Sequence, residues 1–280
     1  MNYTNGPGAK ICYETMGPAD GMPVLLIQGY SAQMIGWRDG FCRKLVERGL
    51  RVIRFDNRDV GLSDKFGGPD DLDGGYTLAD MAADSFRVLD ALDLPAAHIV
   101  GQSMGGMIAQ IMADTRPERV RSLSLIYTAP GLVQRHFVPP LDSSAPPPPS
   151  RLTREDAIEA YFTQEQMVGS PAYPFDTAWI RELGGLCYDR CYAPEGVSRQ
   201  WRAMMRSPAS FADLERLRMP AAVIHGRADG LVKVAAGLEL GARIAQAEVH
   251  LYPGMGHEIV EPLWDEFANI IQRTVLRAAV

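Results

Sequence analysis

Short apolar runs rich in β-branched residues alternate with longer helical patterns along most of this chain. The runs predict strands at residues 24–27, 51–55, 97–100, 122–127, 222–225 and 248–252, with an antiparallel edge strand at 11–14. The helical patterns cover residues 37–48, 77–92 and 103–115, and a last amphipathic one covers 262–276. Such alternation is typical of βαβ units, whose parallel strands form one sheet with helices on its faces. We therefore predict an α/β fold with a mostly parallel central sheet flanked by helices.

One segment breaks the alternation. Residues 139–150 contain six prolines, and because proline lacks a backbone N–H we expect an extended linker there. The pattern is mostly helical from about residue 153 to 217, and the strands resume at 222. We therefore predict a core formed by residues 1–131 and 218–280, and a helical cap with its Pro-rich linker at 132–217. A cap attached in this way is expected to gate the site without supplying its catalytic groups.

The composition limits the possible partners. The 280 residues are 46% hydrophobic and carry 28 basic and 34 acidic side chains, which gives a formal net charge of −6. Because there is no block of Lys and Arg, neither nucleic acid nor an anionic membrane surface is expected as a partner. No apolar run approaches the roughly 20 residues of a membrane helix, and residues 1–10 lack the basic and apolar regions of a secretion signal. We therefore expect a cytoplasmic protein that acts on a small molecule.

The four cysteines have neither the spacing of a zinc site nor that of a disulfide framework: Cys12, Cys42, Cys187 and Cys191. Cys187 and Cys191 are four residues apart and could approach each other on one face of a helix. We expect both to be reduced, apolar side chains, and we expect no metal site.

The most specific motif is Gly101-Gln102-Ser103-Met104-Gly105, which lies between an expected strand and an apolar helix. A Gly-x-Ser-x-Gly motif in this context is typical of a nucleophile elbow, a sharp strand-to-helix turn that exposes the serine. Gly101 and Gly105 leave room for the turn because they lack a Cβ. The unpaired N–H groups at the start of the helix also favour developing negative charge. The motif predicts that Ser103 is a catalytic nucleophile.

A serine hydroxyl is a poor nucleophile unless a base accepts its proton, so a histidine is needed. Four of the five histidines fall in or beside expected strands or before the proline run: His98, His225, His250 and His136. His257 instead follows the last strand, in a loop that also contains Gly254 and Gly256. Because such a loop can place an imidazole over the carboxyl ends of the strands, we predict that His257 is the base.

A carboxylate must hold the imidazole in the correct tautomer. Asp229 lies in the turn after the expected strand at 222–225, whereas the turn after 122–127 offers no carboxylate. Asp56 follows the strand at 51–55 but precedes Ser103 in the chain, and a structural role is expected for it. Asp229 is therefore the predicted acid.

An acyl-transfer site also needs N–H donors for the oxyanion. The backbone N–H of Met104, directly after Ser103, is one expected donor. The second is expected in the loop after the strand at 24–27, where Gly29 allows the backbone to approach a ligand closely. We assign this second donor to the backbone N–H of Tyr30.

With these residues identified, the chain resembles the serine hydrolases of the α/β-hydrolase superfamily. Ser103, Asp229 and His257 follow the order Ser, acid, His that is expected of this fold. The resemblance extends from the loop at residues 28–31 to the final helix, and the helical insertion lies where the family carries its cap.

A second segment supports the resemblance. Residues 56–63, Asp-Asn-Arg-Asp-Val-Gly-Leu-Ser, are similar to the family's D-x-R-G-x-G-x-S segment, which shapes the pocket and the core. Two positions depart from the family pattern. Gln28 stands where the family usually has a histidine, and Asp59 stands where it usually has a glycine.

The resemblance implies acyl chemistry without a metal or cofactor. Epoxide hydrolases and haloalkane dehalogenases of this fold carry Asp at the nucleophile position, so Ser103 argues against both. The remaining activities are carboxylesterase, lipase-like or lactonase activity, an iminopeptidase-like aminopeptidase and a cofactor-free perhydrolase. Residues 29–37 resemble small bacterial esterases, including methylesterases that act on polyketide-derived esters. We expect a serine hydrolase that cleaves small to medium hydrophobic carboxylic esters.

Three alternatives to an ester hydrolase remain open, and one of them is the perhydrolase named above. An aminopeptidase needs an acid in the cap to hold the substrate ammonium, and five residues are candidates: Glu155, Glu159, Glu165, Glu182 and Glu195. A ligand receptor without turnover would keep the fold and the triad but signal through its cap.

The cap also carries aromatic and methionine side chains: Tyr161, Phe162, Met167, Trp179, Trp201, Met204 and Met205. They would line an apolar pocket for the acyl or alcohol group, although a Met and Trp set at helical spacing more often packs inside a cap than contacts substrate. The predicted substrate-binding residues are Gly29, Trp37, Trp179 and Met204.

Overall fold

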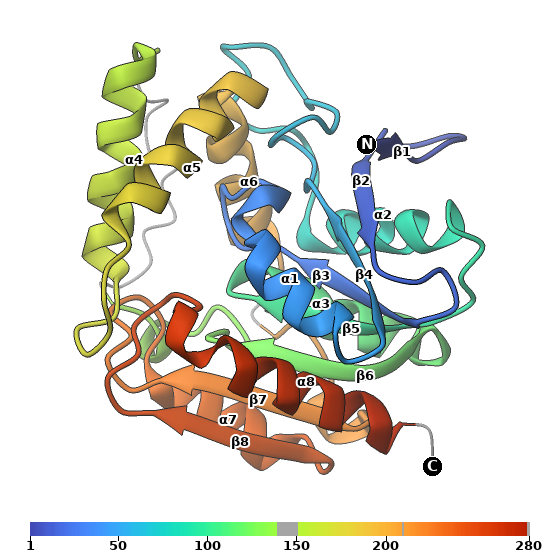
Figure 1. Ribbon diagram of the computed structural model, residues 1–280. Coiled ribbons are helices and arrows are strands. Elements are labelled where there is room, and N and C mark those ends of the chain that lie inside the picture. Colours follow the sequence, from blue (N-terminus) through green and yellow to red (C-terminus); the bar gives the residue numbers. More distant parts are fainter. Residues whose placement is uncertain (139–150, 209, 279–280) are drawn as a thin grey trace.

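A twisted sheet forms the centre of the molecule, as the computed structural model in Figure 1 shows. Within the residues that the structure describes, 1–138, 151–208 and 210–278, eight strands form this sheet in the order β1-β2-β4-β3-β5-β6-β7-β8. The strands are β1 (Asn2–Tyr3), β2 (Cys12–Met16), β3 (Met22–Ile27), β4 (Leu50–Phe55), β5 (Ala97–Gln102), β6 (Val120–Ile126), β7 (Ala221–Gly226) and β8 (Ala247–Tyr252). β3 to β8 pair in parallel, whereas β2 is antiparallel to both β1 and β4. The predicted α/β fold with a mostly parallel sheet is confirmed.

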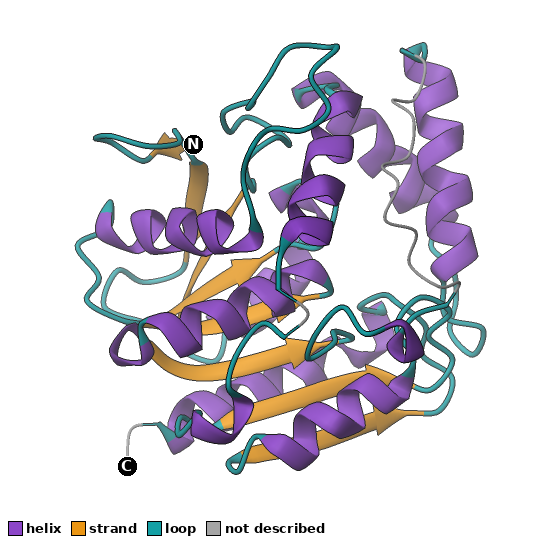
Figure 2. Ribbon diagram, turned by 180° about the vertical axis from the view of Figure 1, so that it is seen from behind, coloured by secondary structure: helices purple, strands orange, loops and turns teal. Residues whose placement is uncertain are grey.

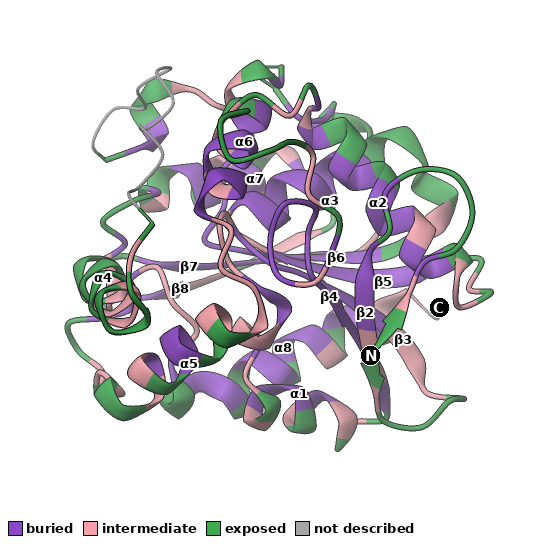
Figure 3. Cartoon of the chain, turned by 90° about the horizontal axis from the view of Figure 1, so that it is seen from above, coloured by how far each residue is buried: buried purple, intermediate pink, exposed green. Residues whose placement is uncertain are grey.

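Helices cover both faces of the sheet. They are α1 (Asp39–Val46), α2 (Leu78–Asp90), α3 (Met104–Thr115), α4 (Arg154–Val168), α5 (Thr177–Arg190), α6 (Pro194–Arg206), α7 (Val234–Arg243) and α8 (Trp264–Arg277). α1 and α8 pack on one face, and α2, α3 and α7 pack on the other (Figures 1 and 3). No helix in the described part of the chain is long and apolar enough to cross a membrane.

The side chains of β3 show why this strand is a continuous apolar run. Val24 and Leu26 join the apolar cluster under α1 and α8, whereas Leu25 and Ile27 join the cluster under α2 and α3. All four side chains are fully buried. Because successive side chains of a strand point to opposite faces, a strand covered on both sides needs apolar residues at every position.

Most expected elements are present, with shifted ends. Thr77 and Asp80 form a capping box that starts α2, as is typical of helix N-termini. The helix expected at 37–48 begins later: a 3₁₀ turn, η1 (Met34–Gly36), comes first, and Trp37 is buried in the core before α1 begins.

The strand expected at the sheet edge, at 11–14, is not the edge. β1 pairs outside β2, and a strand of two residues is too short to show an alternating pattern. α7 was also not among the expected helices, and His136, expected in a loop, lies buried in the 3₁₀ turn η3 (Gln134–His136).

The segment between β6 and β7 contains α4, α5 and α6 beside the sheet (Figure 2). The Pro-rich linker predicted at residues 139–150 lies outside the described residues. Both ends of the segment pack on the sheet-bearing part: Phe137 pairs with Val232 in a β-bridge, and Leu214 joins the core cluster. No residue of α4 is fully buried, although several are partly buried, whereas α6 buries eight (Figure 3).

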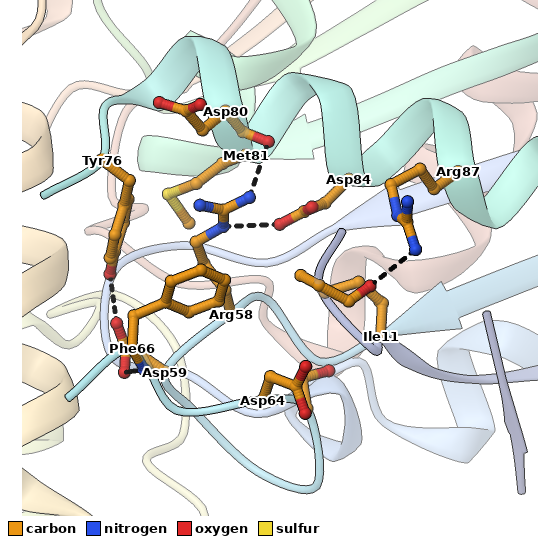
Figure 4. A network of polar contacts seen from close by, with 12 residues as sticks. Ile11, Arg58, Asp59, Asp64, Phe66, Tyr76, Asp80, Met81, Asp84 and Arg87 are labelled. Atoms are coloured by element: carbon orange, nitrogen blue, oxygen red, sulfur yellow. Dashed lines mark hydrogen bonds and ion pairs between the residues drawn. The ribbon is translucent and has the colours of Figure 1, made fainter. Parts of the chain in front are cut away.

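The departure from the family pattern at Asp59 has a structural reason. Asp59 has a positive φ of 71°, a conformation that Asp tolerates better than most residues. Its buried carboxylate accepts hydrogen bonds from Tyr76 Oη (2.7 Å), from the backbone N–H of Phe66 (2.9 Å) and from Arg199 Nε of α6 (2.8 Å). Figure 4 shows the first two of these bonds. Asp59 and the fully buried Arg199 therefore fix α6 to the core.

All four cysteines are free thiols. Cys187 lies in α5 and Cys191 directly after it, and the backbone carbonyls of both accept hydrogen bonds from Gln33 Nε2 (2.8 and 3.2 Å). These contacts tie α5 to the loop after β3.

Candidate active site

The carboxyl ends of β5, β7 and β8 bring Ser103, Asp229 and His257 together. Ser103 Oγ lies 2.9 Å from His257 Nε2, and His257 Nδ1 lies 2.7 Å from Asp229 Oδ2. Because these strands are parallel, their carboxyl ends meet at one edge of the sheet. The three predicted side chains thus form one hydrogen-bonded row, although 154 residues separate Ser103 from His257 in the chain.

Ser103 lies in a strained turn between β5 and α3. Its φ is 52° and its ψ is −122°, far from the conformations of a helix or a strand. A Cβ on Gly101 would lie 2.3 Å from the carbonyl oxygen of Gly105, and a Cβ on Gly105 would lie 2.2 Å from that of Ile27. The two glycines are therefore required by close backbone contacts, and the turn presents the serine hydroxyl at the end of the sheet.

The carboxylate of Asp229 is fully hydrogen-bonded. Its Oδ1 accepts the backbone N–H groups of Leu231 (2.8 Å) and Val232 (2.9 Å), and its Oδ2 faces His257. Burial alone would raise the pKa of Asp229, but the charge of His257 and hydrogen bonds from His225, His257 and Leu231 outweigh it, so the pKa lies well below its usual value. The carboxylate is therefore ionised and can accept the Nδ1–H of His257.

The loop after β3 lies against Ser103. A Cβ on Gly29 would be 3.2 Å from Ser103 Cβ, so a larger residue would crowd Ser103. The N–H of Gly29 bonds to Gln28 Oε1 (3.1 Å), and the N–H of Ser31 bonds to Gln200 Oε1 of α6 (2.9 Å). Between these two lies the N–H of Tyr30.

Gln28, where the family usually has histidine, belongs to a row of polar side chains. Tyr127 Oη donates to Gln102 Oε1, and Gln102 Nε2 donates to Gln28 Oε1. The Tyr127 ring also packs on the His257 ring, with 4.4 Å between the centroids. Sequence reasoning missed Gln102, Tyr127 and Gln200, because the partner of each lies in a distant segment of the chain.

A cavity of about 970 Å³ opens above Ser103 and His257. All four residues predicted to bind substrate line it: Gly29, Trp37, Trp179 and Met204. Other apolar parts of the wall are Met104, Met107, Tyr127, Phe137, Tyr161 and Trp201.

Three of the side chains expected in this wall lie elsewhere. Met167 is 80% exposed, because α4 turns this face to solvent. Phe162 packs on Phe175, with 5.5 Å between the ring centroids, and Met205 packs on the core cluster.

The charged groups of the cavity are mainly acidic. Arg38 pairs with Asp176 (2.9 Å) and Glu261 (3.3 Å). Glu165 also lines the cavity, and burial, together with the charge of Glu258, raises its pKa to about 7. Glu165 therefore loses its proton near neutral pH. In the described residues no group of His, Cys, Asp and Glu side chains is arranged to hold a metal ion.

Glu165→Gln will stabilise the protein above about pH 7 and will have no effect below about pH 4.5. Between these values the unfolded state has released the proton of Glu165 while the folded state keeps it, so the stability of the wild type falls as pH rises. We expect a gain of about 1 to 2 kcal/mol at pH 8, since the side chain is partly accessible. Urea unfolding across this pH range measures it. Glu159→Gln, on the exposed side of α4, is the control, and a gain that does not change with pH would contradict the assignment.

Comparisons with known proteins identify the fold family of this chain. The family model described as the alpha/beta hydrolase fold matches residues 22–168. A protein of Variovorax paradoxus, provisionally named the carbamate hydrolase RutD, is 31% identical over 251 residues, or 88% of each chain. Rhodomycin D methylesterase of Streptomyces sp. (strain C5) is 28% identical over 263 residues, or 86% of each chain. The chain therefore belongs to the α/β-hydrolase fold family, and hydrolase is the class of enzyme that these relatives support.

Solved structures share the fold. The meta-cleavage product hydrolase of Pseudomonas fluorescens IP01 superposes with a TM-score of 0.77 at 24% identity, over 99% of this chain and 98% of that one. The enol-lactonase of Burkholderia xenovorans LB400 gives a TM-score of 0.70 at 21% identity, over 99% of each chain.

Proposed function

We propose that this protein is a serine hydrolase that cleaves carboxylic esters through an acyl-enzyme on Ser103. The observation that carries the proposal is the row Ser103 Oγ, His257 Nε2, His257 Nδ1, Asp229 Oδ2, with contacts of 2.9 and 2.7 Å, at the floor of a largely apolar cavity. This arrangement has the nucleophile, base and orienting acid that acyl transfer requires.

In the first half-reaction Ser103 Oγ attacks the ester carbonyl carbon while His257 Nε2 accepts the hydroxyl proton. The backbone N–H groups of Tyr30 and Met104 stabilise the oxyanion of the tetrahedral intermediate. When this intermediate collapses, His257 returns its proton to the leaving alkoxide, and the alcohol departs. The acyl group remains as an ester on Ser103.

In the second half-reaction water attacks this ester while His257 accepts a proton from the water. The second tetrahedral intermediate releases Ser103 Oγ, which takes the proton back from His257, and the carboxylic acid leaves. Asp229 stays ionised throughout and stabilises the imidazolium.

The cavity favours neutral or cationic esters with a sizeable apolar part. Its aromatic wall and its volume of about 970 Å³ suit a medium-sized hydrophobic group, and its excess of carboxylates disfavours anionic ones. Our narrowest proposal is a methyl ester of a polyketide-derived acid, supported by the relative named rhodomycin D methylesterase.

A second candidate is cleavage of aminoacyl amides. Of the five acids considered for holding a substrate ammonium, Glu165 lines the cavity, whereas Glu159 is exposed and pairs with Arg181. An ammonium bound beside Glu165 would favour its ionised form.

A hydrolysis panel tests the proposal. We expect sustained turnover of neutral p-nitrophenyl esters and of methyl esters, with slower or no release from aminoacyl p-nitroanilides. Faster release from the anilides would favour the aminopeptidase. A single stoichiometric burst would favour a receptor, and peracid formation from a carboxylic acid and hydrogen peroxide would favour a perhydrolase, a possibility supported by relatives named non-heme chloroperoxidase.

A further inference from the structure

The end of α4 and the residues that follow it lie along the loop that carries His257. The backbone N–H of His257 donates to Val168 O (2.9 Å), and that of Gly256 donates to Ser170 Oγ (2.8 Å). In the other direction, the backbone N–H of Ser170 donates to Glu258 Oε1 (2.6 Å). Residues 168–172, which we call the clasp, thus bond to three consecutive residues around the predicted base.

The clasp and the loop are in close backbone contact. A Cβ on Gly256 would lie 2.3 Å from the carbonyl oxygen of Gly169, and a Cβ on Gly254 would lie 2.1 Å from Cβ of Ala172. The hydroxyl-bearing Ser170 is buried, with 6% of its surface exposed. Because its acceptor oxygen is shielded from water, its loss would leave the N–H of Gly256 without a replacement partner.

The core alone fixes only part of the position of His257. Asp229 orients the imidazole through Nδ1, and Tyr127 packs on the ring. Neither contact is to the backbone of residues 256–258, which lie in a loop after β8. The core bonds this loop at residue 255, whose carbonyl accepts the N–H of Ala228 (3.0 Å). Loops move more than the elements that they join, and a displacement of about 1 Å can cost about 100-fold in rate.

We infer that the clasp, through Ser170, is a positioning element that holds His257 within reach of Ser103. This inference rests on the proposed function of Ser103 and His257. It also changes the expected role of the inserted helices. They not only line the pocket but also set the geometry of the base, so the inserted segment is not a separable lid.

The test compares Ser170→Ala with Ser207→Ala. Ser207 is a matched control, because it is also buried, lies at the end of α6 and accepts a backbone N–H of the core, that of Leu78 (3.0 Å). For each variant we measure kcat and KM for a neutral p-nitrophenyl ester, the rate of Ser103 labelling by a small organophosphonate, and hydrogen exchange of residues 254–258.

For Ser170→Ala we expect kcat and the labelling rate to fall together by about tenfold, with KM changed less than twofold and faster exchange at Gly256 and His257. Ser207→Ala keeps the wild-type values, and Ser170→Thr, which retains the hydroxyl, recovers most of the rate. If Ser170→Ala does not fold, Ser170→Cys, whose sulfur is a weak acceptor, takes its place against Ser207→Cys.

The inference is wrong if Ser170→Ala retains the wild-type kcat and labelling rate, or if Ser207→Ala loses as much of both. A wild-type protein that neither turns over the ester nor reacts with the phosphonate would instead refute the proposed function. The two failures are therefore distinguishable.

Discussion

Ser103→Ala will lower the turnover of a p-nitrophenyl ester by about 10⁵-fold or more and will leave the protein folded. The variant keeps the backbone turn between β5 and α3 but lacks the oxygen that attacks the carbonyl carbon, so no acyl-enzyme can form. Loss of the nucleophile in a well-studied serine hydrolase costs on the order of 10⁶-fold in kcat. Steady-state kinetics measure the loss, and mass spectrometry of the phosphonate-treated protein locates the label on Ser103 in the wild type.

Ser85→Ala provides the control for this experiment. Ser85 is buried, and its hydroxyl bonds to Met81 O within α2, away from the cavity. The control variant should retain wild-type turnover and labelling. If Ser103→Ala retained turnover, or if the phosphonate labelled another residue, Ser103 would not be the nucleophile.

The fold and the position of the three central residues could be predicted because the signals are local. Most of the parallel strands are short apolar runs such as Val24–Leu25–Leu26–Ile27, buried from both sides, whereas β8 at the sheet edge is partly exposed. Once the strands are known, the residue that follows each one is known to lie at the same edge of the sheet. Ser103, Asp229 and His257 each follow a strand in this way, so chain order and sheet geometry together bring them near one another.

Contacts between distant segments could not be predicted in the same way. The ion pair of Asp59 and Arg199 joins residues 140 positions apart, and nothing in the local pattern of either residue indicates the other. Ser170 and Gln200 are similar cases. Ser170 follows α4 and Gln200 lies in α6, and tertiary packing alone determines which loop each of them contacts. A helical pattern also does not identify which face of the helix meets the core. For this reason the prediction that Met167 lines the pocket is wrong, and its side chain is exposed to solvent.

The inserted helices contact the loops that carry the proposed catalytic groups. Gln200 of α6 bonds to the N–H of Ser31, next to the proposed donor Tyr30, and the clasp bonds to the loop of His257. Arg199 buries its charge against Asp59 and fixes α6 in place. If these helices were replaced by those of a relative, we would therefore expect the rate of acyl transfer to change as well as the choice of substrate.

Asp229→Asn will lower kcat by about 10⁴-fold while Ser103 and His257 remain in place. The carboxylate accepts the Nδ1–H of His257 at 2.7 Å, which leaves Nε2 free to accept the proton of Ser103. An asparagine can direct its amide N–H towards Nδ1 instead, because its Oδ1 position is held by the N–H groups of Leu231 and Val232. The imidazole would then carry its proton on Nε2, and a protonated Nε2 cannot accept the hydroxyl proton of Ser103. Kinetics above pH 7, with melting temperatures to verify folding, measure this loss.

Asp56→Asn separates this effect from general damage to a buried carboxylate. Asp56 is fully buried and accepts the N–H groups of Met34 (2.7 Å) and Leu62 (2.9 Å) and the guanidinium of Arg190 (3.0 Å), so its role is to hold the loop after β3 and α5 to the core. Removing its charge leaves Arg190 without its buried partner, which typically destabilises a protein by about 3 to 5 kcal/mol. We therefore expect Asp56→Asn to melt at a lower temperature but to retain most of its kcat per folded molecule, the reverse of Asp229→Asn. If the two variants exchanged these behaviours, Asp56 would be the acid that orients His257, and the part played by Asp229 would be limited to holding the turn after β7.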